Sequence, residues 1–265
     1  MSVNPASTPV FILCGGLGTR LKEETEFRPK PMVLIGGRPI LWHVMRSYSA
    51  HGFKRFVLCL GFRGDVIKDY FLDYSAMNSD FTIALGTDEV TVHSVAHDDD
   101  WVVTLADTGE AAMTGARIAR AAAKYLGSAE HFAVTYGDGL TDADLAAEFE
   151  FHVGHGGVGT ILGVCPPSRF GQLKIDGDRV VEFSEKPEFH DTWVNGGYFF
   201  FRRDFLGYLS SDDACVLERE PLVRLAADSE LNVFRHEGFW FAMDTQRDRE
   251  QLEATWAAGE APWRR

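Results

Sequence analysis

The stretch VFILCGGLGTRLKEETEFRPKPMV, residues 10–33, decides the fold class. An apolar run at residues 10–14 leads directly into the glycines of residues 15–18, and Arg20 and Lys30 follow. Because glycine lacks a Cβ, the backbone N–H groups of such a loop can close around a phosphate or a base. In α/β proteins, ligands bind where a loop leaves the end of a strand. The stretch therefore predicts a strand followed by a ligand-binding loop, although a tight structural turn has the same glycine pattern.

Two common phosphate-binding motifs are absent from this loop. The dinucleotide fingerprint requires a third glycine where Leu21 stands, and the P-loop of NTPases requires Gly-Lys-Ser/Thr. A dehydrogenase or a P-loop enzyme is therefore disfavoured. Arg20 and Lys30 instead suit a polyphosphate, since Arg can bind two oxygens at once and Lys adds a mobile positive charge. The alternative for Lys30 is a solvated loop lysine between two stiffening prolines.

The order of apolar and amphipathic segments predicts an α/β protein. Short apolar runs alternate with amphipathic stretches through the first 165 residues, the pattern of β-α units around a mostly parallel sheet. We predict strands at residues 10–14, 55–60, 81–85, 131–136, 158–164, 172–175, 179–183, 197–201 and 231–235. We predict helices at residues 39–51, 63–74, 114–125, 142–155, 203–209, 218–227 and 245–258. Because no linker is visible, we predict one domain over residues 1–265, with a flexible N-terminal tail at 1–9.

Composition and charge exclude several partners. The 39 acidic and 26 basic residues give a net charge of −13, which repels nucleic acid and anionic membranes. No apolar run is long enough to span a bilayer, and the start MSVNPASTP lacks the pattern of a secretory signal. The four cysteines, Cys14, Cys59, Cys165 and Cys215, lie far apart and predict buried free thiols in a reducing cytosol. We expect a cytoplasmic protein with no nucleic-acid or membrane partner.

Two aspartates stand where a metal site could form. Asp138 ends the apolar run in HFAVTYGDG, and Asp244 precedes the last predicted helix. A carboxylate at a strand end can hold Mg²⁺, which keeps most of its waters and binds one or two carboxylates plus phosphate oxygens. The alternatives are a turn-capping role for Asp138 and a helix N-terminal acid for Asp244.

An acid and a base follow the predicted hairpin of residues 172–183. They are Glu185 and Lys186, and Asn195 begins the segment NGGYF. A carboxylate can accept hydrogen bonds from sugar hydroxyls while the neighbouring ammonium meets a phosphate. On the residues alone, a solvated surface pair is the more common role for such neighbours.

Several motifs together carry a resemblance to a known family. GGLGTRL followed by PKPM resembles the signature of the sugar-1-phosphate nucleotidyltransferases, and the acidic EET between them is similar to the cytidylyltransferase branch. The segments GGRPILWHVM, YSAHGF, DTG with MTG, TYGDG, RFG, EKP, NGGYF, GFW and MDT with RD follow in the expected order. The resemblance covers nearly the whole chain. Within the family, the sequence most resembles the bacterial glucose-1-phosphate cytidylyltransferases.

This resemblance implies both a fold and a reaction. The fold is a Rossmann-like three-layer α/β/α nucleotidyltransferase (GT-A-like) fold with a mixed, mostly parallel central sheet. The reaction transfers a cytidylyl group from CTP to α-D-glucose 1-phosphate, giving CDP-glucose and pyrophosphate for deoxysugar or cell-surface polysaccharide precursors. Relatives commonly assemble, which implies a homo-oligomer. The alternatives are a uridylyl- or thymidylyltransferase for a related sugar 1-phosphate, and a non-catalytic sugar-nucleotide-binding protein of the same fold.

The resemblance also implies a role for each candidate residue. Arg20 holds the leaving pyrophosphate, Lys30 the reacting phosphates and Lys186 the nucleophilic phosphate, so these three are the catalytic cations. Asp138 and Asp244 hold Mg²⁺. The implied nucleotide-binding residues are Leu13, Gly15, Gly16, Leu17, Gly18, Thr19, Thr114, Gly115 and Arg117. The implied sugar-binding residues are Gly139, Gly171, Glu185 and Asn195, most of them in the C-terminal part from about residue 166 to 265.

Residue 116 departs from the cytidylyltransferase pattern. The segment DTGEAAMTGAR, residues 107–117, resembles a base-reading loop that usually has a second glycine where this chain has Ala116. If residue 116 begins the following helix, the methyl group favours that helix. If it touches the base instead, one methyl group can alter nucleotide preference. We favour the helix.

Overall fold

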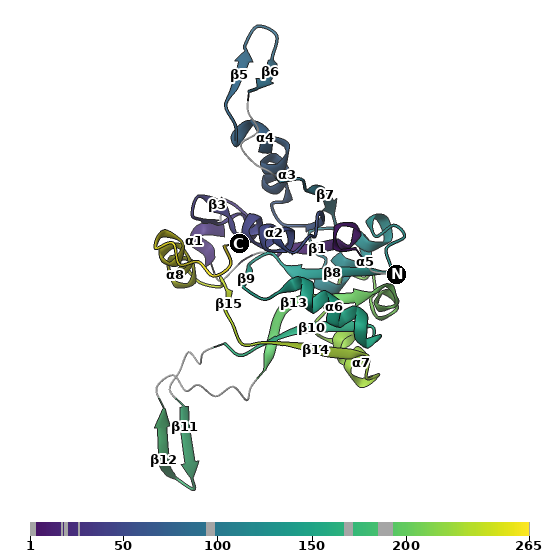
Figure 1. Ribbon diagram of the computed structural model, residues 1–265, viewed down its shortest axis with the longest axis vertical. Coiled ribbons are helices and arrows are strands. Elements are labelled where there is room, and N and C mark those ends of the chain that lie inside the picture. Colours follow the sequence, from purple (N-terminus) through teal and green to yellow (C-terminus); the bar gives the residue numbers. More distant parts are fainter. Residues whose placement is uncertain are drawn as a thin grey trace.

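The computed structural model describes residues 4–16, 18, 21–25, 27–93, 99–166, 172–184 and 193–264. Its centre is a seven-stranded sheet in the order β14-β10-β13-β8-β1-β4-β7 (Figure 1). In this sheet β13 runs antiparallel to both of its neighbours, β10 and β8, whereas the other pairs are parallel. Helices cover both faces, so the prediction of a layered α/β fold with a mixed, mostly parallel sheet is confirmed.

The elements have the following bounds. The sheet consists of β1 (Pro9–Cys14), β4 (Arg55–Leu60), β7 (Val102–Asp107), β8 (His131–Tyr136), β10 (Gly159–Val164), β13 (Val194–Arg202) and β14 (Leu231–His236). Pairs of shorter strands are β2 (Leu34–Ile35) with β3 (Arg38–Pro39), β5 (Phe81–Ala84) with β6 (Glu89–Val92), β9 (Gly139–Thr141) with β15 (Trp240–Ala242), and β11 (Gln172–Asp176) with β12 (Arg179–Ser184). The α-helices are α1 (Lys22–Thr25), α2 (Ile40–Ala50), α3 (Gly64–Leu72), α4 (Tyr74–Met77), α5 (Thr114–Tyr125), α6 (Leu145–His155), α7 (Glu220–Ala227) and α8 (Gln246–Ala257). Short 3₁₀ helices are η1 (Pro5–Ser7), η3 (Lys30–Met32) and η4 (Arg203–Tyr208).

Each face of the sheet buries its own set of side chains. Along β1, Val10, Ile12 and Cys14 belong to one buried cluster, and Phe11 and Leu13 belong to the other. This follows from the strand geometry, in which successive side chains point to opposite faces. Residues of α2 and α6 complete the first cluster, and residues of α5 and α7 complete the second. A strand buried on both faces reads as a continuous apolar run, which is why β1 is so visible in the sequence.

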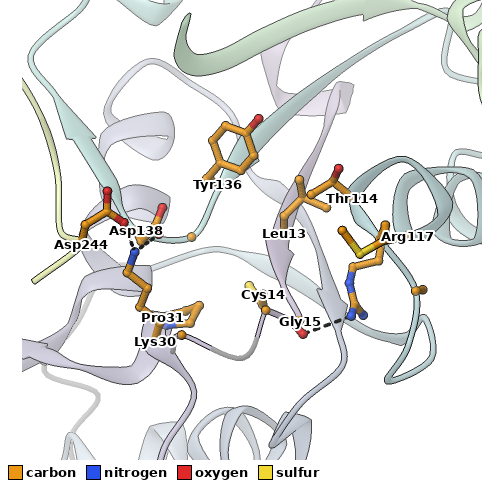
Figure 2. Close-up of a pocket in the computed structure, with 15 residues that line it drawn as sticks. Leu13, Cys14, Gly15, Lys30, Pro31, Thr114, Arg117, Tyr136, Asp138 and Asp244 are labelled. Carbon is orange, nitrogen blue, oxygen red and sulfur yellow. Dashed lines mark hydrogen bonds and ion pairs between the residues drawn. The ribbon is translucent and has the colours of Figure 1, made fainter. Parts of the chain in front are cut away.

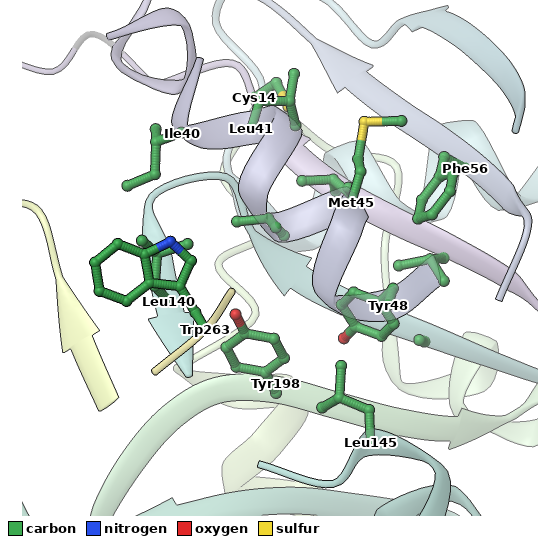
Figure 3. Packing of buried hydrophobic residues seen from close by; sticks show 14 of the residues in the cluster. Cys14, Ile40, Leu41, Met45, Tyr48, Phe56, Leu140, Leu145, Tyr198 and Trp263 are labelled. Carbon is green, nitrogen blue, oxygen red and sulfur yellow. The ribbon is translucent and has the colours of Figure 1, made fainter. Parts of the chain in front are cut away.

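Helix α2 packs as its apolar spacing predicts. Ile40, Val44 and Tyr48 are fully buried. Figure 3 shows Met45 and Tyr48 directed toward the sheet, and the Tyr48 ring stacks on Tyr198 of β13 with the ring centroids 5.8 Å apart. This packing fixes α2 against the strand that runs antiparallel in the middle of the sheet.

Two strand assignments differ from the sequence prediction. The prediction that residues 81–85 form a sheet strand is wrong, because β5 pairs only with β6, in a hairpin that projects beyond α3 and α4 (Figure 1). Strand β7, at the edge of the sheet, was not predicted. Val102 at its start is 61% exposed although the strand sequence VVTLAD is largely apolar, as is possible at the edge of a sheet.

The structure also bears on the predictions for the N-terminal stretch, the cysteines and membrane-spanning helices. Within the stretch predicted as a flexible tail, Asn4 accepts a hydrogen bond from the N–H of Ala6 at 3.0 Å and caps η1. No disulfide joins any of the four cysteines; Cys14 and Cys59 are buried as predicted, whereas Cys165 and Cys215 are only partly buried. None of the helices in the described part of the chain is both long and apolar enough to cross a lipid bilayer.

Candidate active site

A cavity of about 340 Å³ lies at the carboxyl-terminal ends of β1 and β8. These strands are parallel neighbours, with Leu13 paired with Tyr136, so the loops that leave them meet at one edge of the sheet. Strand β1 continues into the glycine-rich loop, and β8 continues into Gly137 and Asp138. The loop that was predicted to bind a ligand is therefore one wall of a cavity at the expected edge of an α/β sheet.

The structure gathers most of the described candidate residues around this cavity. Those that line it are Leu13, Gly15, Gly16, Gly18, Lys30, Thr114, Arg117, Asp138 and Asp244. Figure 2 shows Lys30, Asp138 and Asp244 at one end and Leu13, Thr114 and Arg117 at the other. Candidates outside the described residues are Leu17, Thr19, Arg20, Gly171, Glu185 and Lys186. The cavity thus has a charged end and a second end built from β1 and α5.

Six lining residues were not predicted. They are Cys14, Pro31, Ala112, Met113, Tyr136 and Gly137. Cys14 and Tyr136 are the last residues of β1 and β8, so their position at a strand end was the available signal. Pro31 lies within η3, directly after Lys30, where the sequence suggested only a stiffened loop.

Lys30 joins the two aspartates at the charged end. Its Nζ lies 2.6 Å from Asp138 Oδ2 and 2.7 Å from Asp244 Oδ1. Burial acts to lower the pKa of Lys30, but the two carboxylates outweigh burial and raise the pKa above its ordinary value. Lys30 therefore stays a cation, held between two acids that are 106 residues apart in the chain (244 − 138).

The backbone brings the two aspartates together. Strands β9 and β15 pair with Gly139 opposite Ala242, and the N–H of Met243 donates to the carbonyl of Asp138 at 3.0 Å. The Asp248 carboxylate then accepts from the N–H groups of Asp244, at 3.0 Å, and of Thr245, at 2.8 Å. Asp248 is only 6% exposed and forms a capping box with Thr245 at the start of α8. These hydrogen bonds fix the backbone of Asp244 beside Asp138, at the charged end of the cavity.

The charged end fits Mg²⁺. Two carboxylate oxygens already share one cation, the Lys30 ammonium, so they are placed to share a metal ion. Among the described residues, no cluster of three or more His, Cys, Asp or Glu is placed to hold a metal. Mg²⁺ typically takes one or two protein carboxylates and completes its shell with waters and phosphate oxygens.

Arg117 organises the opposite end of the cavity through the backbone. Its side chain donates to the carbonyls of Leu60 at 2.9 Å, Gly109 at 2.8 Å, Gly15 at 3.0 Å and Glu110 at 3.1 Å. A Cβ at residue 15 would lie 2.2 Å from the Arg117 guanidinium carbon, so only glycine allows this approach. Arg117 was expected to bind the nucleotide, and the structure shows it joining the glycine-rich loop to the end of β4 and to the loop after β7.

Three further candidates lie outside the cavity lining. The N–H of Gly115 donates to the carbonyl of Cys215 at 3.0 Å, and a Cβ at residue 115 would meet the Cys215 sulfur at 2.6 Å. The carbonyl of Gly139 accepts from the Tyr198 hydroxyl at 2.8 Å. The side chain of Asn195 accepts from the N–H of Gly197 at 2.7 Å. In this structure Gly115 therefore provides room for the Cys215 segment rather than for a base.

Ala116 lies within α5, and its replacement by glycine is expected to lower stability without changing nucleotide preference. Its side chain is fully buried and does not line the cavity. Ala116→Gly removes a buried methyl group and adds backbone freedom, at a cost of roughly 1 to 2 kcal/mol. Thermal unfolding measures the loss, and the exposed Ala123→Gly in the same helix isolates the backbone part. A change above tenfold in the ratio of kcat/KM for CTP and UTP would contradict this expectation.

A glycine-rich loop, a lysine and two carboxylates surround one cavity at the carboxyl-terminal edge of the sheet of this α/β protein. The family described as nucleotidyl transferase matches residues 10–236. The glucose-1-phosphate cytidylyltransferase of Salmonella typhi is 47% identical over 253 residues, which are 96% of this chain and 97% of that protein. The protein of the same name from Salmonella typhimurium strain LT2 has the same identity and coverage. The chain therefore belongs to the nucleotidyl transferase family.

A solved structure agrees with this assignment at the level of the fold. The UTP-bound UGPase of Acinetobacter baumannii superimposes with a TM-score of 0.69 over 95% of this chain and 94% of that one. The two sequences are 15% identical, so this likeness shows the shared fold alone.

Proposed function

We propose that this chain transfers a cytidylyl group from CTP to α-D-glucose 1-phosphate, giving CDP-glucose and pyrophosphate. The observation that carries the proposal is the single cavity that joins the glycine-rich loop to Lys30, Asp138 and Asp244. CTP suits this cavity with its triphosphate at the charged end and its base at the end formed by Thr114 and Arg117. The Salmonella relatives bear the name of this activity and match nearly the whole chain, which supports the choice of substrates.

Charge requires a further cation at the triphosphate end. One ammonium against the carboxylates of Asp138 and Asp244 leaves a net negative charge, which would repel a triphosphate. Asp138 and Asp244 would hold Mg²⁺, which supplies positive charge to the phosphate oxygens when bound. Lys30 then keeps its own charge available to the reacting phosphates. We assign Arg20 to bind the leaving pyrophosphate and Lys186 to bind the phosphate of the sugar.

The chemistry needs positioning more than proton transfer. An oxygen of the sugar 1-phosphate attacks the α-phosphorus of CTP, and the bond from that phosphorus to the bridging oxygen breaks to release pyrophosphate. A phosphate monoester is already a nucleophile, so the protein contributes alignment and charge stabilisation. We assign Gly139, Gly171, Glu185 and Asn195 to the hexose.

We propose a cytoplasmic location for the protein. Its four cysteines form no disulfide with one another, and disulfides are rare in the reducing cytosol.

A pyrophosphate-release assay with glucose 1-phosphate and a panel of nucleotides tests this function. Release with CTP, and at least tenfold slower release with UTP or dTTP, is the expected result. Faster release with UTP or dTTP would identify the alternative, a uridylyl- or thymidylyltransferase. Binding of CTP without release would identify a non-catalytic nucleotide-binding protein.

The projecting hairpin supports a homo-oligomer. Phe81 pairs with Val92 and Ile83 with Val90, so these four apolar side chains share one face of the β5–β6 hairpin. Their exposed fractions lie between 36% and 49%. An isolated two-stranded hairpin is only marginally stable, and an exposed apolar patch marks an interaction surface. We infer that a second copy of the chain covers this face.

Ile83→Glu is expected to reduce the assembly to a smaller species, because it places a charge in the centre of the apolar hairpin face. Thr91→Glu is the matched control, since Thr91 lies on the opposite face, across from Thr82. Light scattering on a size-exclusion column measures the mass of each protein. A wild-type monomer, or an unchanged mass for Ile83→Glu, would contradict the proposal.

A further inference from the structure

Glu218 binds two hydroxyl groups of the cavity wall from outside. The Thr114 hydroxyl donates to Glu218 Oε2 at 2.8 Å, and the Tyr136 hydroxyl donates to Glu218 Oε1. Thr114 and Tyr136 both line the cavity, whereas Glu218 does not. The carboxylate, which is exposed to solvent, therefore lies outside the cavity lining and accepts both hydroxyl protons.

Two hydrogen bonds together fix the direction in which the Thr114 hydroxyl points its proton. The N–H of Leu217 donates to Thr114 Oγ1 at 2.9 Å, so this oxygen must act as an acceptor toward Leu217. A hydroxyl has one proton to donate and two lone pairs, and a carboxylate can only accept. The single proton thus goes to Glu218, one lone pair goes to Leu217, and the other lone pair remains. Toward a ligand, Thr114 can accept a hydrogen bond and cannot donate one.

Pyrimidines differ in the hydrogen-bonding group at position 4. Cytosine carries an amino group that donates there, whereas uracil and thymine carry a carbonyl oxygen that accepts. A carbonyl oxygen facing a hydroxyl whose proton is turned away meets lone pair against lone pair. Acceptor-only hydroxyls in a cavity wall therefore favour the aminopyrimidine.

We propose that Glu218 is a specificity-determining residue that makes Thr114 and Tyr136 acceptors and so selects CTP over UTP and dTTP. Glu218 acts through these two hydroxyls and does not itself touch the nucleotide. This inference rests on the proposed nucleotide site. It adds to it a residue, a direction of hydrogen bonding and a reason for the choice of base.

Glu218→Gln is the most direct test because it keeps the shape and changes the hydrogen-bonding pattern. The glutamine oxygen can accept from one hydroxyl, while its NH₂ group must donate to the other. One of the two hydroxyls then has its proton free to point into the cavity and bind a carbonyl oxygen. We expect the ratio of the dissociation constants for UTP and CTP to fall at least tenfold, mainly through tighter UTP binding.

Thr114→Val gives a second, independent change. It removes the acceptor, so CTP is expected to bind at least tenfold more weakly while UTP binding changes little. Glu220→Gln is the matched control, since Glu220 pairs with Arg224 at 3.5 Å on the exposed surface of α7 and does not line the cavity. Isothermal titration calorimetry with CTP and UTP, with Mg²⁺ and without sugar phosphate, measures both constants without turnover.

The two variants distinguish specificity from a structural role. If Glu218 only braces α5 against residues 213–218, Glu218→Gln weakens both nucleotides equally and the ratio stays constant, which overturns the inference. If Glu218→Gln fails to fold, as judged by circular dichroism, the UTP to CTP ratio of Thr114→Val decides in the same way. The wild-type preference for CTP tests the proposed function, and the shift between wild type and variants tests the role of Glu218.

Discussion

Asp138→Ala is expected to remove nearly all turnover and leave the fold intact. Asp138 follows the end of β8 and faces the cavity, where it contacts Lys30 at 2.6 Å. Its removal takes away one of two carboxylates that would hold Mg²⁺ and leaves Lys30 with a single partner. Since metal assistance contributes several kcal/mol to such reactions, we expect kcat to fall on the order of 1,000-fold, about 4 kcal/mol.

Pyrophosphate release measures the loss, and circular dichroism and the melting temperature check the fold. Asp204→Ala is the matched control, because Asp204 is exposed in η4 and pairs with Arg202, two residues before it, at 3.0 Å. A direct readout of the ion is Mn²⁺ binding followed by electron paramagnetic resonance, which should weaken in Asp138→Ala and stay unchanged in Asp204→Ala. Near wild-type turnover with unchanged dependence on Mg²⁺ would overturn the role of Asp138.

The parts of the fold that could be predicted are those whose signal is local. Strands β4 and β8 and helix α5 have the predicted bounds, because two-sided burial gives continuous apolar runs and the helix gives 3.6-residue spacing. Strand β7 was not predicted, and β5 was predicted to join the main sheet. An edge strand and an unpaired hairpin bury little within one chain, so their side chains do not report on which sheet they join.

The candidate site could likewise be predicted from the sequence only in part. The positions of Lys30, Asp138 and Asp244 follow from the motifs, but their contact depends on the pairing of β9 with β15, two strands of three residues each. Glu218 could not have been found from the sequence, because it lies 82 residues from Tyr136 and 104 from Thr114. The hydrogen-bonding state of a hydroxyl depends on all its neighbours at once, and no local pattern encodes that.

Arg117→Lys is expected to lower the free energy of unfolding by about 3 kcal/mol. Arg117 is 4% exposed, and its one planar group binds carbonyls at the end of β4 and in the loops that follow β1 and β7. The lysine ammonium has three donors at a single point and cannot reproduce this fork. Several buried carbonyls would then lose their partner, at roughly 1 to 3 kcal/mol for each group left unsatisfied.

Urea unfolding measures this loss, and Arg120→Lys provides the control on the same helix. Arg120 also donates to backbone carbonyls, of Thr108 at 2.9 Å and Ser211 at 2.6 Å, but water can replace it because its side chain is 30% exposed. We expect the control to lose less than about 1 kcal/mol. Equal losses would mean that burial adds nothing to the Arg117 contacts. Because one of the lost partners is the carbonyl of Gly15, we expect Arg117→Lys also to weaken CTP binding, which would link the stability of these segments to the proposed nucleotide site.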